Sequence, residues 1–164
     1  MASSLFSELK WAGVNCELVT EYTKDKVWEE SFKVLDSQIY ILGKQYHRIQ
    51  RVSDKVDVVI TDSSLLLTPL YNKDYGETLD KLAIELYHRF QNLNFLLTRK
   101  KDYNPVGRME TEEEAKLLDR RIETLLNNND IPFKHVVGIK KSIPNIFSDI
   151  YFHVYGEYYK GEYA

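Results

Sequence analysis

The sequence lacks the features of an exported or membrane-embedded protein. Its single cysteine, Cys16, has no partner for an internal disulfide, and a lone thiol is typical of a reducing compartment. No apolar run approaches the roughly 20 residues of a membrane-spanning helix. No basic segment followed by an apolar run opens the chain, so we expect no secretory signal. The sequence therefore predicts a cytoplasmic protein with no membrane partner.

The sequence also lacks an excess of positive charge. It has 22 Lys and Arg against 25 Asp and Glu, which gives a formal net charge of −3. This balance argues against a general nucleic-acid coat protein. A nucleic-acid-binding module remains one hypothesis for the function, because basic residues recur at Lys44, Arg48, Arg51 and Lys55. The length of 164 residues and the 43% hydrophobic content predict one globular domain spanning residues 1–164.

Glycine is scarce and scattered. None of the seven glycines belongs to a G-x-x-x-x-G-K-[ST] sequence, whose backbone amides and lysine cradle nucleotide phosphates. The 164 residues therefore supply no phosphate-binding loop of this kind.

The hydrophobic pattern alternates between strand and helix periods. Short apolar runs predict strands at residues 14–20, 56–61, 94–98 and 135–137. Apolar residues at helical spacing, a Thr111-x-x-Glu114 capping box and Pro144 predict helices at 3–11, 24–52, 79–90, 111–125 and about 143–160. Strands that alternate with helices of this length predict an α/β domain built on a parallel sheet.

The predicted helix over residues 24–52 carries the longest apolar stripe. We expect the stripe to pack against the sheet, and a short coiled-coil seam is the alternative. Its members are Trp28, Phe32, Leu35, Ile39, Leu42, Tyr46 and Ile49.

Polar residues follow three of the predicted strands. They are Glu21, the Asp62-Ser63-Ser64 run and Arg99. In parallel sheets ligands bind beyond the carboxyl ends of the strands, so these residues predict a site at one edge. An acid for Mg²⁺ or for an attacking hydroxyl, together with a cation, suits phosphoryl transfer. The alternatives are a turn or helix cap at Asp62 and an exposed strand end at Glu21.

A loop with glycine and proline follows the third strand. Arg99 and Arg108 bracket the segment 102–108, which includes Asn104. We interpret this segment as a candidate lid, and an ordinary solvated surface loop is the alternative.

Three stretches carry a resemblance to a known family. They are residues 19–25 (VTEYTKD), residues 58–63 (VVITDS) and residues 104–114 (NPVGRMETEEE). Together they resemble the P-loop ATPase/kinase family that includes nicotinamide-riboside-kinase-like domains and many bacteriophage proteins. The resemblance covers about residues 3–138.

The resemblance implies a three-layer αβα P-loop-kinase-like sheet, ATP with Mg²⁺ as cofactors, and a nucleoside, nucleotide or related small metabolite as substrate. It implies catalytic roles for Glu21, Asp62 and Arg108, with Asp62 also on the metal. We expect substrate-binding residues among Lys24, Gln45, Arg48, Ser63, Arg99 and Asn104.

The chain departs from the family pattern at its start. That pattern opens with a strand and the phosphate-binding loop, whereas residues 1–10 already look like the helix that follows them. By the resemblance, the missing strand belongs in the middle of the sheet, and its loss leaves two strand edges to be joined or covered. We expect either a chain truncated at its N-terminus or a non-catalytic relative that keeps the fold to bind a nucleotide or a protein.

The C-terminal region is rich in aromatic residues. Phe147, Tyr151, Tyr155 and Tyr159 recur every four residues, which places them on one helix face. Docking on the sheet of the same domain explains this face, and a surface for self-association or for a partner protein is the alternative.

Overall fold

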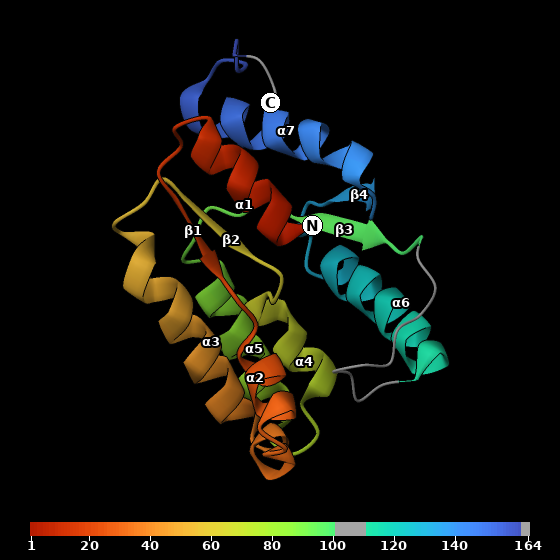
Figure 1. Ribbon diagram of the computed structural model, residues 1–164. Helices are drawn as coiled ribbons and strands as arrows, with labels where there is room; N and C mark the ends of the chain where they lie inside the picture. The colour runs from red at the N-terminus through yellow and green to blue at the C-terminus, as the bar shows by residue number, and fades with distance from the viewer. Residues whose placement is uncertain (101–110, 162–164) are drawn as a thin grey trace.

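Helices alternate with short strands along the chain (Figure 1). The computed structural model describes residues 1–100 and 111–161. Its elements in chain order are α1 (Ala2–Trp11), β1 (Cys16–Val19), α2 (Tyr22–Trp28), the 3₁₀ helix η1 (Phe32–Asp36), α3 (Gln38–Ser53), β2 (Val58–Thr61), η2 (Leu65–Leu67), α4 (Thr68–Tyr71), α5 (Gly76–Tyr87), β3 (Phe95–Thr98), α6 (Glu112–Asn128), β4 (Lys134–Val137), η3 (Lys140–Ser142) and α7 (Ile143–Tyr155).

The strands form two separate parallel pairs. β1 pairs with β2, with Val19 opposite Thr61 at the end of the ladder. β3 pairs with β4, with Leu96 opposite His135. The predicted α/β class and parallel pairing are therefore confirmed, while the described strands do not join into one continuous sheet. The three-layer arrangement stays a prediction.

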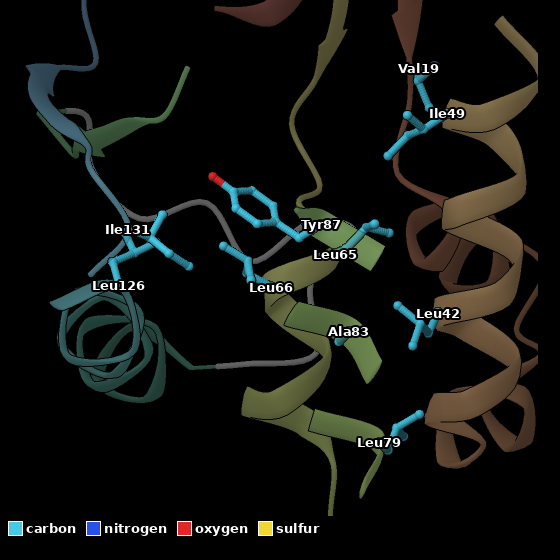
Figure 2. Packing of buried hydrophobic residues seen from close by; sticks show 10 residues of the cluster. All are labelled: Val19, Leu42, Ile49, Leu65, Leu66, Leu79, Ala83, Tyr87, Leu126 and Ile131. Atoms are coloured by element: carbon cyan, nitrogen blue, oxygen red, sulfur yellow. The ribbon is translucent and has the colours of Figure 1, made fainter. Parts of the chain in front are cut away.

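Two hydrophobic clusters hold these elements together. The first joins α3, η2, α5 and the end of α6, and Figure 2 shows it extending from Leu42 and Ile49 on α3 to Leu126 and Ile131. The second joins α1 and α7 around Leu9 and is built on Cys16 and Ile60 of the first strand pair. Burying these apolar side chains is the main driving force for folding.

The prediction of one continuous helix over residues 24–52 is wrong. This stretch is divided into α2, η1 and α3, and Glu30 has a φ of 54°. A residue in this left-handed region cannot continue a right-handed helix, so the chain turns there. The turn breaks the register of the apolar stripe: Leu42 and Ile49 are in the core, but Trp28 is 63% exposed.

The C-terminal helix is also shorter than predicted. α7 ends at Tyr155 because Gly156 adopts a φ of 73° as its left-handed C-cap. Tyr159 therefore lies beyond the helix and returns to contact Phe147 and Tyr151, with ring centroids 5.3 and 5.2 Å away. The predicted packing against the domain itself is confirmed for Phe147, which is buried in the second cluster.

The capping box at the start of α6 is confirmed. The Thr111 hydroxyl accepts the Glu114 N–H, and the Glu114 carboxylate accepts the Thr111 N–H at 2.7 Å. These bonds stabilise the ionised carboxylate and hold the pKa of Glu114 below its usual value. In the part of the chain that the structure describes, no helix is long and apolar enough to cross a membrane.

Candidate functional site

The segments that were predicted to carry the site leave the sheet where β1 and β2 end. Because Val19 and Thr61 are paired in a parallel ladder, the next residues of both strands leave the sheet at the same edge. Glu21 follows Val19 by two residues and Asp62 follows Thr61 directly. The two predicted catalytic acids therefore emerge from adjacent strands.

The two acids differ in their surroundings. Glu21 is half-buried at the N-cap position of α2, and its carboxylate accepts a hydrogen bond from the Thr23 hydroxyl. Asp62 is exposed to solvent. The predicted metal role of Asp62 would rest on few protein ligands, because the described residues contain no group of three His, Cys, Asp or Glu side chains that could hold an ion.

Gln45 is a structural link at this edge. Its side chain is only 4% exposed, and its Oε1 accepts the Tyr22 N–H at 3.0 Å. Its Nε2 donates to the carbonyl oxygen of Ser63 at 3.4 Å. Ser63 is itself buried, and its N–H donates to the Thr61 hydroxyl at 3.1 Å. The hydrogen-bonding groups of Gln45, expected to bind substrate, are thus already used within the fold.

Arg48 is engaged in a similar way. Its guanidinium donates to Asp25 at 2.5 Å and to the carbonyl oxygen of Thr20 at 3.2 Å. It also lies over the Tyr22 ring, 5.0 Å from the centroid. Lys24, by contrast, is exposed and available to a ligand.

A tyrosine pair beside the edge was missed by sequence reasoning. The Tyr22 hydroxyl donates to that of Tyr40 at 3.1 Å, and Lys26 and Lys44 lie 5.3 Å from the Tyr22 and Tyr40 rings respectively. The donated bond, with help from Lys44, lowers the pKa of Tyr40, whereas burial raises the pKa of Tyr22. The spacing of Tyr40 and Lys44 on one face of α3 was the available sequence signal.

Arg99 lies on the other strand pair. Its guanidinium donates to Asp119 of α6 at 2.8 Å. It borders a hollow of about 330 Å³ between α6 and the β3–β4 pair, with Leu96, His135 and Lys116 also in its wall. The predicted site residues Asn104 and Arg108 lie outside the described residues.

A comparison with known proteins decides the family. A family model described as an AAA domain matches residues 2–142. The chain belongs to this AAA domain family. No curated protein and no solved structure matched the chain.

Members of the AAA domain family generally bind ATP with Mg²⁺, so the fit of the present residues to that cofactor matters. A triphosphate needs several converging backbone N–H groups and a lysine, and this sequence contains no such glycine-rich loop. Mg²⁺ commonly takes one or two carboxylates and completes its shell with phosphate oxygens and water. Asp62 offers one exposed carboxylate of this kind, whereas the sequence contains no G-x-x-x-x-G-K-[ST] loop for the triphosphate.

Proposed function

We propose that this AAA domain is the acceptor-binding part of a P-loop phosphotransferase that acts on a nucleoside, a nucleotide or a related small metabolite. The observation that supports it is the parallel pairing of Val19 with Thr61. It directs Glu21 and Asp62 to the edge of the strands where ligands of such sheets bind.

The residues of the edge divide into two groups in this proposal. Gln45 and Ser63 fix the strand ends, since their polar groups are bound within the fold. Glu21 approaches an acceptor hydroxyl and receives its proton. The exposed carboxylate of Asp62 accepts a hydrogen bond from the acceptor and would hold Mg²⁺ when the cofactor is bound. Lys24 offers a positive charge to an anionic group of the acceptor.

The family's chemistry needs a phosphate-binding loop, which we place outside residues 1–164. Each charge-assisted bond of such a loop contributes roughly 1.5–3 kcal/mol. The 164-residue chain is therefore expected to bind MgATP weakly by itself.

A non-catalytic binding module is the second candidate. It is favoured by Gln45 and Arg48, because both are expected substrate ligands whose polar groups already bind the protein. In this case the chain uses its fold to bind a nucleotide or a protein without transferring a phosphoryl group.

Titration of the chain with nucleosides and nucleoside monophosphates, followed by NMR, separates the two candidates. We expect shifts of the backbone amides around Glu21 and Asp62. Asp62→Asn should weaken binding by roughly tenfold, as expected for loss of a charged hydrogen bond, while the exposed control Asp74→Asn should leave it unchanged. Equal binding by Asp62→Asn, or no response to any acceptor, would favour the non-catalytic module.

A further inference from the structure

A group of cations surrounds the hydrogen-bonded Tyr22–Tyr40 pair. The charged groups of Lys26 and Arg48 lie 5.3 and 5.0 Å from the centre of the Tyr22 ring. The Lys44 ammonium lies 5.3 Å from the centre of the Tyr40 ring. Cations are attracted to the negative face of an aromatic ring, so the two rings bring three positive charges to one place.

Lys44 is the cation of this group that has no carboxylate partner. Lys26 pairs with Glu29, and Arg48 pairs with Asp25. Lys44 is exposed, and it forms no salt bridge with any residue that the structure describes. The group therefore carries one positive charge in excess, beside the more exposed ring of the pair.

The Tyr40 hydroxyl keeps its own proton available to a ligand. Its oxygen accepts the hydrogen bond from the Tyr22 hydroxyl at 3.1 Å, and it donates to no other group within residues 1–100 and 111–161. The bond from Tyr22, together with the charge of Lys44, lowers the pKa of Tyr40. Such a polarised hydroxyl is a strong donor to an anion. Tyr40 is 44% exposed, so an external group can reach it.

The pair lies beside the strand ends that carry the two acids of the proposed site. Tyr22 directly follows Glu21, and α2 packs against α3 (Figure 1). Lys44 directly precedes Gln45, whose side chain accepts the Tyr22 N–H. A ligand held by Glu21 can therefore extend to Tyr40 and Lys44 along the surface where α2 meets α3.

We propose that Tyr40 and Lys44 bind a phosphate monoester carried by the acceptor, which makes the acceptor a nucleoside monophosphate or a related sugar phosphate and not an uncharged nucleoside. This inference rests on the proposed function and names its substrate class. A phosphate monoester carries a charge of about −1.5 to −2 at neutral pH and three strong acceptor oxygens. Tyr40 supplies one hydroxyl donor, and Lys44 supplies the excess charge with the donors of its ammonium group.

Matched compounds with and without the phosphate test this subsite. Ribose 5-phosphate and ribose differ in the phosphate alone, and neither requires knowledge of the base. Each is titrated into the full chain, together with the four ribonucleoside 5′-monophosphates and their nucleosides, and followed by NMR of ¹³C-labelled tyrosine rings and of backbone amides. We expect the phosphate compounds to shift the Tyr40 ring and to bind at least tenfold more tightly than their uncharged counterparts.

Variants of the two residues locate the phosphate. Lys44→Met and Tyr40→Phe each remove one donor from an exposed side chain, so neither should disturb the fold. Each should weaken binding of the phosphate compounds by roughly tenfold and leave binding of the nucleosides unchanged. Lys55→Met, at an exposed lysine beyond the other end of α3, is the matched control and should change neither.

Two results would overturn the subsite. One is equal affinity for compounds with and without phosphate, and the other is equal binding of the phosphate compounds by Lys44→Met and Lys55→Met. The proposed function survives either result if Asp62→Asn still weakens nucleoside binding. Phosphate-dependent shifts of Tyr40 that Asp62→Asn leaves unchanged would support the subsite and contradict the proposed function, so the two failures are distinguishable. The absence of any shift of the Tyr40 ring would overturn the subsite, whatever the amides around Glu21 show.

Discussion

The side-chain oxygen of Gln45 accepts the backbone N–H of Tyr22 at 3.0 Å. Gln45 belongs to α3, and its amide nitrogen also donates to Ser63, just after β2. One buried side chain on a helix thereby connects the segments that follow β1 and β2. This link fixes the relative position of the loops that carry Glu21 and Asp62.

Replacing this link should destabilise the fold. Gln45→Leu keeps the bulk of the side chain but leaves the buried Tyr22 N–H without its acceptor, which should lower the free energy of unfolding by about 1–3 kcal/mol. Urea unfolding followed by circular dichroism measures the loss. Gln50→Leu, an exposed position on the same helix, is the control and should change stability by about 0.5 kcal/mol or less. Equal effects of both changes would show that the bonds of Gln45 are replaced by water.

The Tyr22–Tyr40 pair should titrate in a fixed order. The bond from Tyr22 to Tyr40 stabilises the phenolate of Tyr40, so its pKa is lowered, while burial disfavours the phenolate of Tyr22 and raises its pKa. As the pH rises, Tyr40 should therefore lose its proton first. NMR of ¹³C-labelled tyrosine rings measures both midpoints.

A variant of the donor checks the cause of this order. Tyr22→Phe removes the donated hydrogen bond and should move the midpoint of Tyr40 upward. Tyr75→Phe, at an exposed tyrosine just before α5, should leave it unchanged. A midpoint of Tyr40 that does not respond to Tyr22→Phe would mean that the nearby lysines, Lys44 and Lys26, lower its pKa without the hydrogen bond.

The ion pair between Arg99 and Asp119 should contribute little to folding. Its side chains are 38% and 39% exposed, and exposed pairs are worth up to about 1 kcal/mol. Arg99→Ala should therefore cost less than about 1 kcal/mol, and the cost should shrink in high salt because of screening. A double-mutant cycle with Asp119→Ala, measured by urea unfolding at low and high NaCl, isolates the pair. A salt-independent coupling well above that value would contradict its assignment as a surface pair.

Local sequence signals predicted those features of the fold that depend on residues close together in the chain. The Thr111–Glu114 capping box and the alternation of strands and helices were both confirmed, because hydrogen-bonding side chains and apolar periods act over a few residues. The helix over 24–52 was wrong since the positive φ of Glu30 has no residue signature of the kind that glycine provides.

The site was harder to predict than the strands. The positions of Glu21 and Asp62 follow from parallel pairing, which the apolar runs indicate. The buried contacts of Gln45 do not, because a glutamine on a helix is ordinarily solvated and its burial depends on which face meets the strand ends. The tyrosine pair likewise depends on how α2 and α3 meet. The spacing of Tyr40 and Lys44 places both on one face of α3, but it does not indicate that Tyr22 lies against that face.

Phe147 and Phe152 provide the last prediction, because they lie on the same helix in opposite environments. Phe147 is 1% exposed within the second cluster, whereas Phe152 is 46% exposed and stacks on Tyr158 with centroids 4.8 Å apart. Phe147→Ala leaves a cavity in a close-packed core and should lower the free energy of unfolding by about 3–5 kcal/mol. Phe152→Ala removes one exposed ring contact and should cost about 1 kcal/mol or less.

Thermal and urea unfolding of the two α7 variants measure this difference. Because both changes remove the same atoms from α7, helix propensity contributes equally and the contrast reports burial alone. A cost for Phe152→Ala as large as that for Phe147→Ala would show that the outer face of α7 is also covered in solution. Sedimentation at two protein concentrations would then show whether a second copy of the chain covers the outer face of α7, since a dimer dissociates on dilution and exposes that face again.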